Sequence, residues 1–167
     1  MPVLLSRVDD RLIHGQVVVG WAQNLKANHI VVINDDIIRN DMQKFLFRMA
    51  TPSDIKLSIL SVKEASEQLK KREFDEDSVI LLFRSPADVC GLLENGGRIG
   101  EINIGGMHYG ENKVQLFDAI FVGEEDVRNL LNIKELGVSM EVRMVPSDSK
   151  KDIIKAIDEK YFKKGKK

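Results

Sequence analysis

The residues best suited to chemistry lie together in one segment, Arg7-Val8-Asp9-Asp10-Arg11-Leu12-Ile13-His14-Gly15-Gln16. This segment contains an imidazole, two guanidinium groups and two carboxylates. Arginine offers planar, bidentate hydrogen bonds to phosphate oxygens, and histidine titrates near neutral pH. The combination is typical of a phosphate cradle in which His14 is the nucleophile and Arg11 or Arg7 binds the phosphoryl group. The alternative interpretation of the same residues is a solvated or capping histidine beside surface ion pairs.

The same segment directly follows an apolar run of strand length and precedes an apolar helical stripe that begins at Val17. His14 and Gly15 are therefore expected at, or just before, the N-terminus of a helix. Free amides and the positive end of the helix dipole attract anions there. Gly15 would let that backbone approach a ligand closely, and Asp10 is expected to cap the helix or to orient an arginine.

A second cluster, Asn103-Ile104-Gly105-Gly106-Met107-His108-Tyr109-Gly110, also follows an apolar run. Adjacent glycines permit backbone angles and close approaches that other residues do not. Gly105, Gly106 and His108 are therefore supporting candidates for the same site. Two interpretations remain open, a tight turn or a segment that brings amides or His108 toward His14.

Apolar runs of strand length alternate along the chain with segments of helical spacing. The predicted strands are Val3–Val8, Ile30–Ile33, Ile55–Leu60, Val79–Phe83, Ile102–Ile104, Ile120–Val122 and Met140–Val145. Among the predicted helices, one carries Met42, Phe45, Leu46 and Met49 as an apolar stripe. This alternation predicts an α/β fold, a single-domain open, mostly parallel sheet with helices on both faces. Ligands of such sheets bind beyond the carboxyl ends of the strands, where both clusters fall.

The composition narrows the class of protein. The 167 residues predict one domain over 1–167, with a basic and frayed end from Lys160 onward. Lys plus Arg is 25 against Asp plus Glu 26, and this balance argues against nucleic acid as a partner. No apolar run is long enough to span a membrane, the start lacks the features of a signal peptide, and the lone Cys90 cannot form an internal disulfide. A cytoplasmic protein is expected.

Several familiar sites are absent from the sequence. Gly15 and Gly20 have the spacing of a phosphate-binding loop, but Trp21-Ala22 follows instead of Lys-Ser or Lys-Thr. The three histidines are far apart and only one cysteine is present, so no metal site is predicted. The alternative to phosphoryl transfer is a non-catalytic α/β module that uses the first segment to bind a phosphorylated metabolite.

The segment Arg7 to Val17 resembles the N-terminal signature of the IIB components of the bacterial phosphoenolpyruvate-dependent sugar phosphotransferase system, mannose/fructose/sorbose family. The segment Asn103 to Tyr109 is similar to the second recurrent stretch of that family. Chain length and the order of strands and helices agree with the family as well.

The resemblance implies a phosphoryl carrier. His14 would accept phosphate on Nδ1 from a phosphohistidine of the IIA protein and pass it to a sugar carried by the membrane components IIC and IID. Arg11 would stabilise the phosphoryl group, and no cofactor would be needed. The resemblance further implies a cytoplasmic protein that associates peripherally with the membrane transporter, and is compatible with a homodimer.

Overall fold

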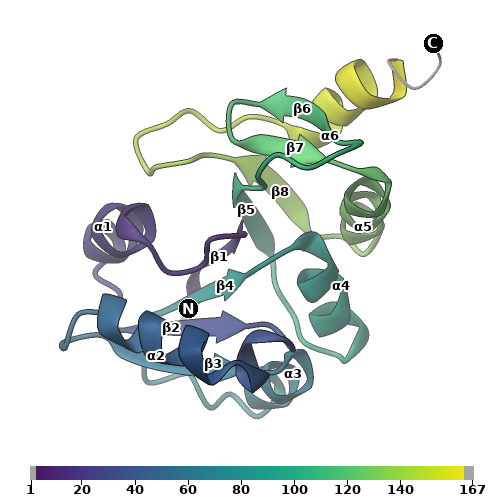
Figure 1. The fold of residues 1–167 in the computed structure, drawn as a ribbon. Coiled ribbons are helices and arrows are strands. Elements are labelled where there is room, and N and C mark those ends of the chain that lie inside the picture. The colour runs from purple at the N-terminus through teal and green to yellow at the C-terminus, as the bar shows by residue number, and fades with distance from the viewer. Residues whose placement is uncertain (1–2, 164–167) are drawn as a thin grey trace.

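Six strands form a central sheet in the order β3-β2-β4-β1-β5-β8, and each neighbouring pair is parallel (Figure 1). The computed structural model describes residues 3–163. The strands of this sheet are β1 (Val3–Asp9), β2 (His29–Ile33), β3 (Lys56–Leu60), β4 (Val79–Phe83), β5 (Glu101–Gly106) and β8 (Ser139–Val142). β2 and β4 are buried at every position, as parallel strands covered on both faces are. The predicted open, parallel α/β sheet is confirmed.

Helices cover both faces of the sheet (Figure 1). One face carries η1 (Gln16–Ala22), which continues into α1 (Gln23–Leu25), and α2 (Asp41–Ala50), which follows the single turn η2 (Ile37–Arg39). The other face carries α3 (Val62–Lys70), α4 (Pro86–Glu94), α5 (Glu124–Glu135) and α6 (Ile153–Ala156), which continues into η3 (Ile157–Phe162).

Alternate residues of each strand enter two separate cores, because successive side chains of a strand point to opposite faces. Ile80 and Leu82 of β4 pack with Val17 and Trp21 of η1. Val79, Leu81 and Phe83 pack on the other side with residues of α3, α4 and α5. The helix that follows His14 is therefore fixed to the sheet by its buried stripe.

The path of the chain across the sheet changes direction at β1 and β4. From β1 the chain continues to β2 and β3, whereas from β4 it continues to β5 and β8 on the opposite side. The two strands are neighbours, with Val8 opposite Phe83 in the register. Open α/β sheets bind ligands in the crevice at such a point.

The C-terminal part differs from the sequence-based prediction in two ways. The predicted strand Ile120–Val122 exists as β7, but it pairs antiparallel with β6 (Val114–Phe117), which the sequence pattern did not reveal. Residues 160–162 belong to η3 rather than to a frayed end, and the Lys160 ammonium donates to the carbonyl of Leu116 at 2.6 Å. The rest of the predicted frayed end, 164–167, lies outside the described residues.

The apolar stripe of α2 does not face the sheet. Met42, Phe45, Leu46 and Met49 are 67%, 58%, 49% and 71% exposed, respectively. Phe47, on the opposite side of the helix, is buried and packs into the core. An apolar helical stripe ordinarily covers a core, so α2 has a second apolar face that this chain leaves open.

No helix within residues 3–163 is both long enough and apolar enough to cross a membrane.

Candidate functional site

The loop after β1 turns sharply back on itself. Leu12 adopts a left-handed conformation with φ +58°, and its amide donates to the Asp9 carbonyl at 2.9 Å. Positive φ is uncommon for residues other than glycine. The Leu12 side chain is buried in the core beneath the loop, which holds the turn in place. The turn directs the chain so that His14 returns to the end of β1.

His14 is held by Asp9 through one nitrogen of its ring. Nε2 lies 2.7 Å from Asp9 Oδ2, and the His14 side chain is 15% exposed whereas that of Asp9 is fully buried. An ionised carboxylate can only accept a hydrogen bond, so Nε2 carries the hydrogen and Nδ1 keeps its lone pair. Nδ1 makes no hydrogen bond with any group in residues 3–163. Nδ1 is therefore the ring nitrogen of His14 that keeps a free lone pair among the described residues.

Asp9 stays ionised although it is buried. Burial alone would raise the pKa of its carboxyl. The hydrogen bond with His14, the charge of Arg7 and the amide of Arg11 outweigh burial, and the pKa lies below its ordinary value. The Arg11 amide donates to Asp9 Oδ1 at 3.1 Å. The carboxylate thus supplies a fixed negative charge next to the His14 ring.

Arg7 contacts the same Asp9 carboxylate as His14 and is fully buried. Its Nε and Nη2 donate to Asp9 Oδ2 at 3.3 and 3.0 Å, and its Nη1 donates to Asn103 Oδ1 at 2.7 Å. The carbonyl of Arg143 accepts a further bond from Nη1 at 3.1 Å. The expected direct contact of Arg7 with phosphate does not fit this burial. Arg7 instead supports the carboxylate that holds His14.

Arg7 belongs to a buried polar row that crosses three neighbouring strands. Arg7 of β1 lies opposite Asn103 of β5, and Asn103 lies opposite Glu141 of β8. The Asn103 amide donates to Glu141 Oε1 at 3.1 Å. Each member of the row has a hydrogen-bond partner, as buried polar groups require. The position of Asp9 is thereby set by the sheet itself.

Gly105 and Gly106 make room for this row. A Cβ at Gly105 would lie 1.9 Å from Arg7 Cζ, and a Cβ at Gly106 would lie 3.0 Å from Asp9 Oδ1. The position of these glycines agrees with the prediction that they support the site. They do so in a different way from the one expected. They leave space for side chains of β1 rather than presenting amides to a ligand.

Arg11 and Gly15 lie on the outer side of His14. The Arg11 side chain is 45% exposed, with Nε 3.8 Å from Asp9 Oδ1 and Nη2 3.4 Å from Gln16 Oε1. Gly15 precedes the first residue of η1, and the first helical amide bonds are donated by Val17 and Val18 to the His14 carbonyl. Gly15 has φ −52°, and a Cβ there would meet nothing within 4 Å. Nothing in residues 3–163 therefore requires glycine at this position.

Comparison with known proteins identifies the family. The family model described as the PTS system sorbose subfamily IIB component matches residues 3–167. The chain belongs to this family of IIB components. It is therefore a phosphotransferase component in sugar uptake, as the sequence resemblance predicted.

Characterised relatives and solved structures agree with this assignment. The IIB component is 33% identical over 162 residues to the sorbose-specific EIIB component of Klebsiella pneumoniae, covering 97% of this chain and 99% of the relative. It is 32% identical to the mannose-specific EIIAB component of Escherichia coli, covering 95% of this chain and 50% of that protein. The crystal structure of the IIBSor domain of the sorbose permease from Klebsiella pneumoniae superposes with a TM-score of 0.88 at 33% identity, covering 95% of this chain and 98% of that chain.

The loop after β5 places His108 next to the first loop of the IIB component. The His108 amide donates to Asp10 Oδ2 at 2.7 Å, and its Nδ1 faces Asp10 Oδ1. Asp10 was expected to cap the helix or to orient an arginine. Its carboxylate binds His108 instead, and η1 has no side-chain cap. Both side chains are partly exposed, at 48% for His108 and 31% for Asp10.

A polar hollow opens at the carboxyl edge of the sheet, beside Asp10. It has a volume of about 730 Å³, and its charged and titratable lining is mixed: Arg11, Arg84, Lys113 and His108 on one hand, and Asp10, Asp36, Asp88 and Asp126 on the other. A smaller hollow of about 340 Å³ adjoins the same edge and is also lined by Arg11 and Arg84. The Arg84 guanidinium makes no hydrogen bond or ion pair with any residue in the part of the chain that the structure describes. Arg84 directly follows Phe83, the last residue of β4. Its position after a strand is the sequence signal that could have identified it as a site residue.

The structure brings together most of the predicted site residues of this IIB component. His14, Arg11, Gly15 and Asp10 share one loop, and His108 contacts Asp10. The sequence interpretation omitted Asp9, although it is the direct partner of His14. Within residues 3–163, no group of three or more His, Cys, Asp or Glu side chains is placed to hold a metal ion.

Proposed function

We propose that His14 carries the phosphoryl group on Nδ1, between a phosphohistidine of an A component and a sugar. The observation that supports this proposal is the contact between His14 Nε2 and Asp9, which leaves Nδ1 as the available nitrogen. The Escherichia coli relative is an EIIAB component, in which an A component and a B component occur in the same protein. We take an A component as the donor and the membrane components IIC and IID as carriers of the sugar.

Transfer to His14 exchanges one P–N bond for another. The Nδ1 lone pair attacks phosphorus, and the bond from phosphorus to the donor imidazole breaks. The transition state is loose, so catalysis depends on alignment and on stabilising the phosphoryl oxygens. Asp9 and Arg7 fix the direction of the His14 ring, and Asp9 balances the positive charge that the phosphorylated ring acquires.

The phosphoryl oxygens meet positive potential on the outer side of His14. Arg11 is the exposed guanidinium next to the ring, and the amides of Gly15 and Gln16 precede the helical hydrogen bonds of η1. Both kinds of donor stabilise phosphate oxygens without a metal ion. In the second step, a sugar hydroxyl oxygen forms a bond to phosphorus, the bond to Nδ1 breaks and returns its electron pair to the ring, and the hydroxyl proton is released to solvent.

Two variants test the phosphorylated residue. The protein is incubated with phosphoenolpyruvate, the general proteins of the system and an A component, and the label is followed on a denaturing gel. Wild type and His108→Ala are expected to acquire an acid-labile, base-stable phosphate, and His14→Ala none. Full labelling of His14→Ala would contradict the proposal. Tight binding of a phosphorylated metabolite by His14→Gln, with no covalent label on wild type, would favour the binding-module alternative.

NMR spectroscopy identifies the phosphorylated nitrogen directly. Two-bond nitrogen–proton correlations of the phosphorylated protein distinguish Nδ1 from Nε2. Phosphorus on Nδ1 is expected, since Asp9 occupies Nε2. Phosphorus on Nε2 would show that the ring leaves Asp9 before transfer.

A further inference from the structure

The exposed face of α2 is the one concentrated apolar surface among the residues that the structure describes. Nine large hydrophobic side chains are exposed within residues 3–163, and four of them are Met42, Phe45, Leu46 and Met49. They occupy positions i, i+3, i+4 and i+7, which share one side of a helix. Scattered exposed apolar residues are ordinary, but a contiguous group marks an interaction site.

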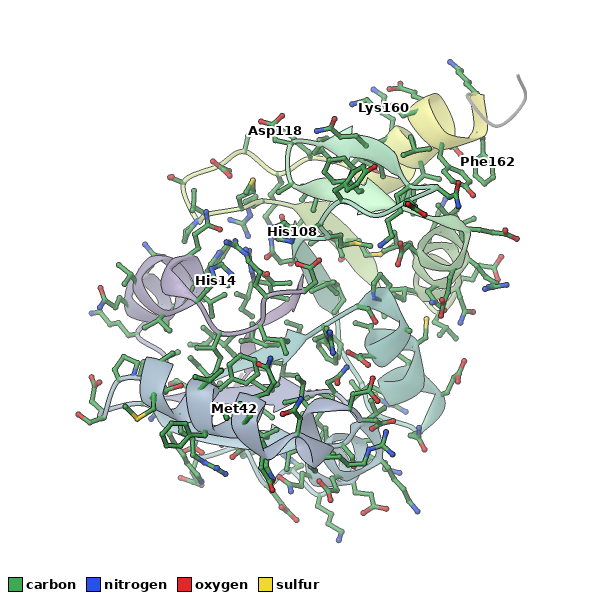
Figure 2. The ribbon with its side chains drawn as sticks, in the orientation of Figure 1. His14, Met42, His108, Asp118, Lys160 and Phe162 are labelled. Atoms are coloured by element: carbon green, nitrogen blue, oxygen red, sulfur yellow. The ribbon has the colours of Figure 1, made fainter. Side chains whose placement is uncertain are left out.

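The first turn of α2 lies beside the site proposed for phosphoryl transfer, although the four apolar side chains themselves line neither hollow. Asn40, which caps α2, and Gln43 of its first turn line the smaller hollow together with Arg11 and Arg84. Figure 2 shows Met42 on α2 and His14 on the loop before η1, so that the two elements border this edge of the sheet. A molecule that reaches His14 past Arg11 is therefore brought to the N-terminal end of α2.

A protein partner placed at His14 is large enough to contact α2 as well. A phosphohistidine donor must place its phosphorus next to His14 Nδ1, and a specific protein partner covers about 800 Å², equivalent to a disc about 16 Å in radius. Such a footprint extends beyond the hollow that Arg11 and Arg84 line. A protein donor placed at His14 can therefore contact the α2 face at the same time.

The charges around the face indicate the chemistry of the partner. Arg48 on α2 and Arg84 are exposed and form no ion pair within residues 3–163, whereas Asp36 and Asp41 are paired with Arg39 and Lys44. Among the charged residues of α2 and of the smaller hollow, the unpaired groups are therefore the guanidiniums of Arg48 and Arg84. A partner with an apolar centre and carboxylates at its edge complements this surface.

We infer that the α2 face, Met42, Phe45, Leu46 and Met49, is the docking surface for the A component that phosphorylates His14. The inference rests on the proposed function. Two of the four side chains are methionines, whose flexible, polarisable chains adapt to a partner that must bind and leave in each cycle. A second copy of the chain on this face would cover the approach to His14 past Arg11, so the A component is the better occupant.

The test separates docking from chemistry. The probe is a purified A component chosen because it phosphorylates the wild-type chain at His14. The variant is Met42→Gln with Phe45→Gln, which removes apolar surface and keeps residues that favour a helix. Leu136→Gln is the matched control, because Leu136 is 52% exposed and follows α5 on the other face of the sheet. Initial rates are measured against the concentration of phosphorylated A component.

The double variant is expected to raise the KM for the A component at least about tenfold, with kcat unchanged within about twofold, and Leu136→Gln to match wild type. Labelling of His14 by phosphoramidate, a donor too small to use α2, is expected at the wild-type rate, which also shows that the variant is folded. A wild-type KM in the double variant would overturn the inference. If sedimentation then also showed that the double variant loses self-association, the occupant of the face would be a second copy of the chain. If no A component labels the wild-type chain, the proposed function fails and the inference falls with it.

Discussion

Two adjacent aspartates at the end of β1 hold two histidines in opposite ways. Asp9 is fully buried, contacts Nε2 of His14, and is bonded from behind by Arg7. Asp10 is 31% exposed and faces Nδ1 of His108, with a second bond to the His108 amide. The two pairs contain the same side chains, but they leave different ring nitrogens available.

The two pairs differ in burial and in what lies behind each carboxylate. Burial lowers the local dielectric and strengthens the contact of Asp9, and the polar row behind Arg7 fixes its position. An exposed pair such as Asp10–His108 is weakened by water and contributes little energy. We expect the first pair to determine reactivity and the second to tie two loops together.

The largest effect is expected from Asp9→Asn. The substitution removes the ionised acceptor that fixes the His14 tautomer, and phosphotransfer should fall at least about 100-fold. Arg7 loses its charged partner inside the protein, so the free energy of unfolding should drop by about 3–5 kcal/mol. Transfer kinetics and urea denaturation measure the two effects. Asp10→Asn is the matched control, and an equal loss of rate in that variant would remove the distinction between the pairs.

Gly105→Ala should disturb the Asp9–His14 pair and leave the Asp10–His108 pair unchanged. A Cβ 1.9 Å from Arg7 Cζ forces the guanidinium away from Asp9, at a cost of about 1–3 kcal/mol or more. Transfer should slow by roughly tenfold, and the thermal midpoint should fall. Gly15→Ala is the control for stability, since a Cβ there meets nothing within 4 Å. A thermal midpoint of Gly105→Ala equal to that of Gly15→Ala would show that Arg7 moves without penalty.

The lowered pKa of Asp9 predicts how its contribution to stability varies with pH. A carboxyl whose pKa is lower in the folded state stabilises the fold fully above its unfolded pKa of about 3.9. The stabilisation is lost as the pH falls through the lower, folded pKa. The difference in free energy of unfolding between wild type and Asp9→Asn should therefore be constant from pH 7 to about 5 and shrink below about 4. Urea titrations over this range check the prediction, and a difference that grows toward low pH would contradict it.

The smallest effect is expected from His108→Ala. Loss of the exposed contact with Asp10 should change the free energy of unfolding by about 0–1 kcal/mol, and the rate of phosphotransfer by less than about threefold. Transfer assays at saturating A component provide the measurement. A loss of tenfold or more would mean that His108 takes part in the reaction.

The architecture could be predicted from the sequence because the buried strands consist of apolar residues. Val79 to Phe83 is apolar throughout and buried at every residue, so its pattern identifies a central parallel strand. β6 was not predicted because only one of its four residues, Leu116, is buried. Short, half-exposed strands carry too little periodicity to be recognised.

The site was predicted in part, for a reason that lies in strand geometry. His14 and Arg11 could be identified by their residue types and position after a strand. The role of Arg7 depended on burial, which residue type does not reveal. Arg7 and Asp9 are two residues apart in β1 and therefore point to the same side, a signal that could have paired them. The row with Asn103 needs the register of β5, which only the folded sheet provides.

Trp21 gives this relay a built-in optical probe. It is the single tryptophan of the chain and is buried, with the Arg7 and Arg143 guanidiniums 5.4 and 5.1 Å from its ring centroid. Its indole nitrogen donates to the Met144 carbonyl at 3.0 Å. Indole emission responds to nearby charge, and Asp9 contacts both His14 and Arg7. We therefore expect phosphorylation of His14 to change the emission of Trp21, so that stopped-flow fluorescence on the unlabelled protein would time the reaction.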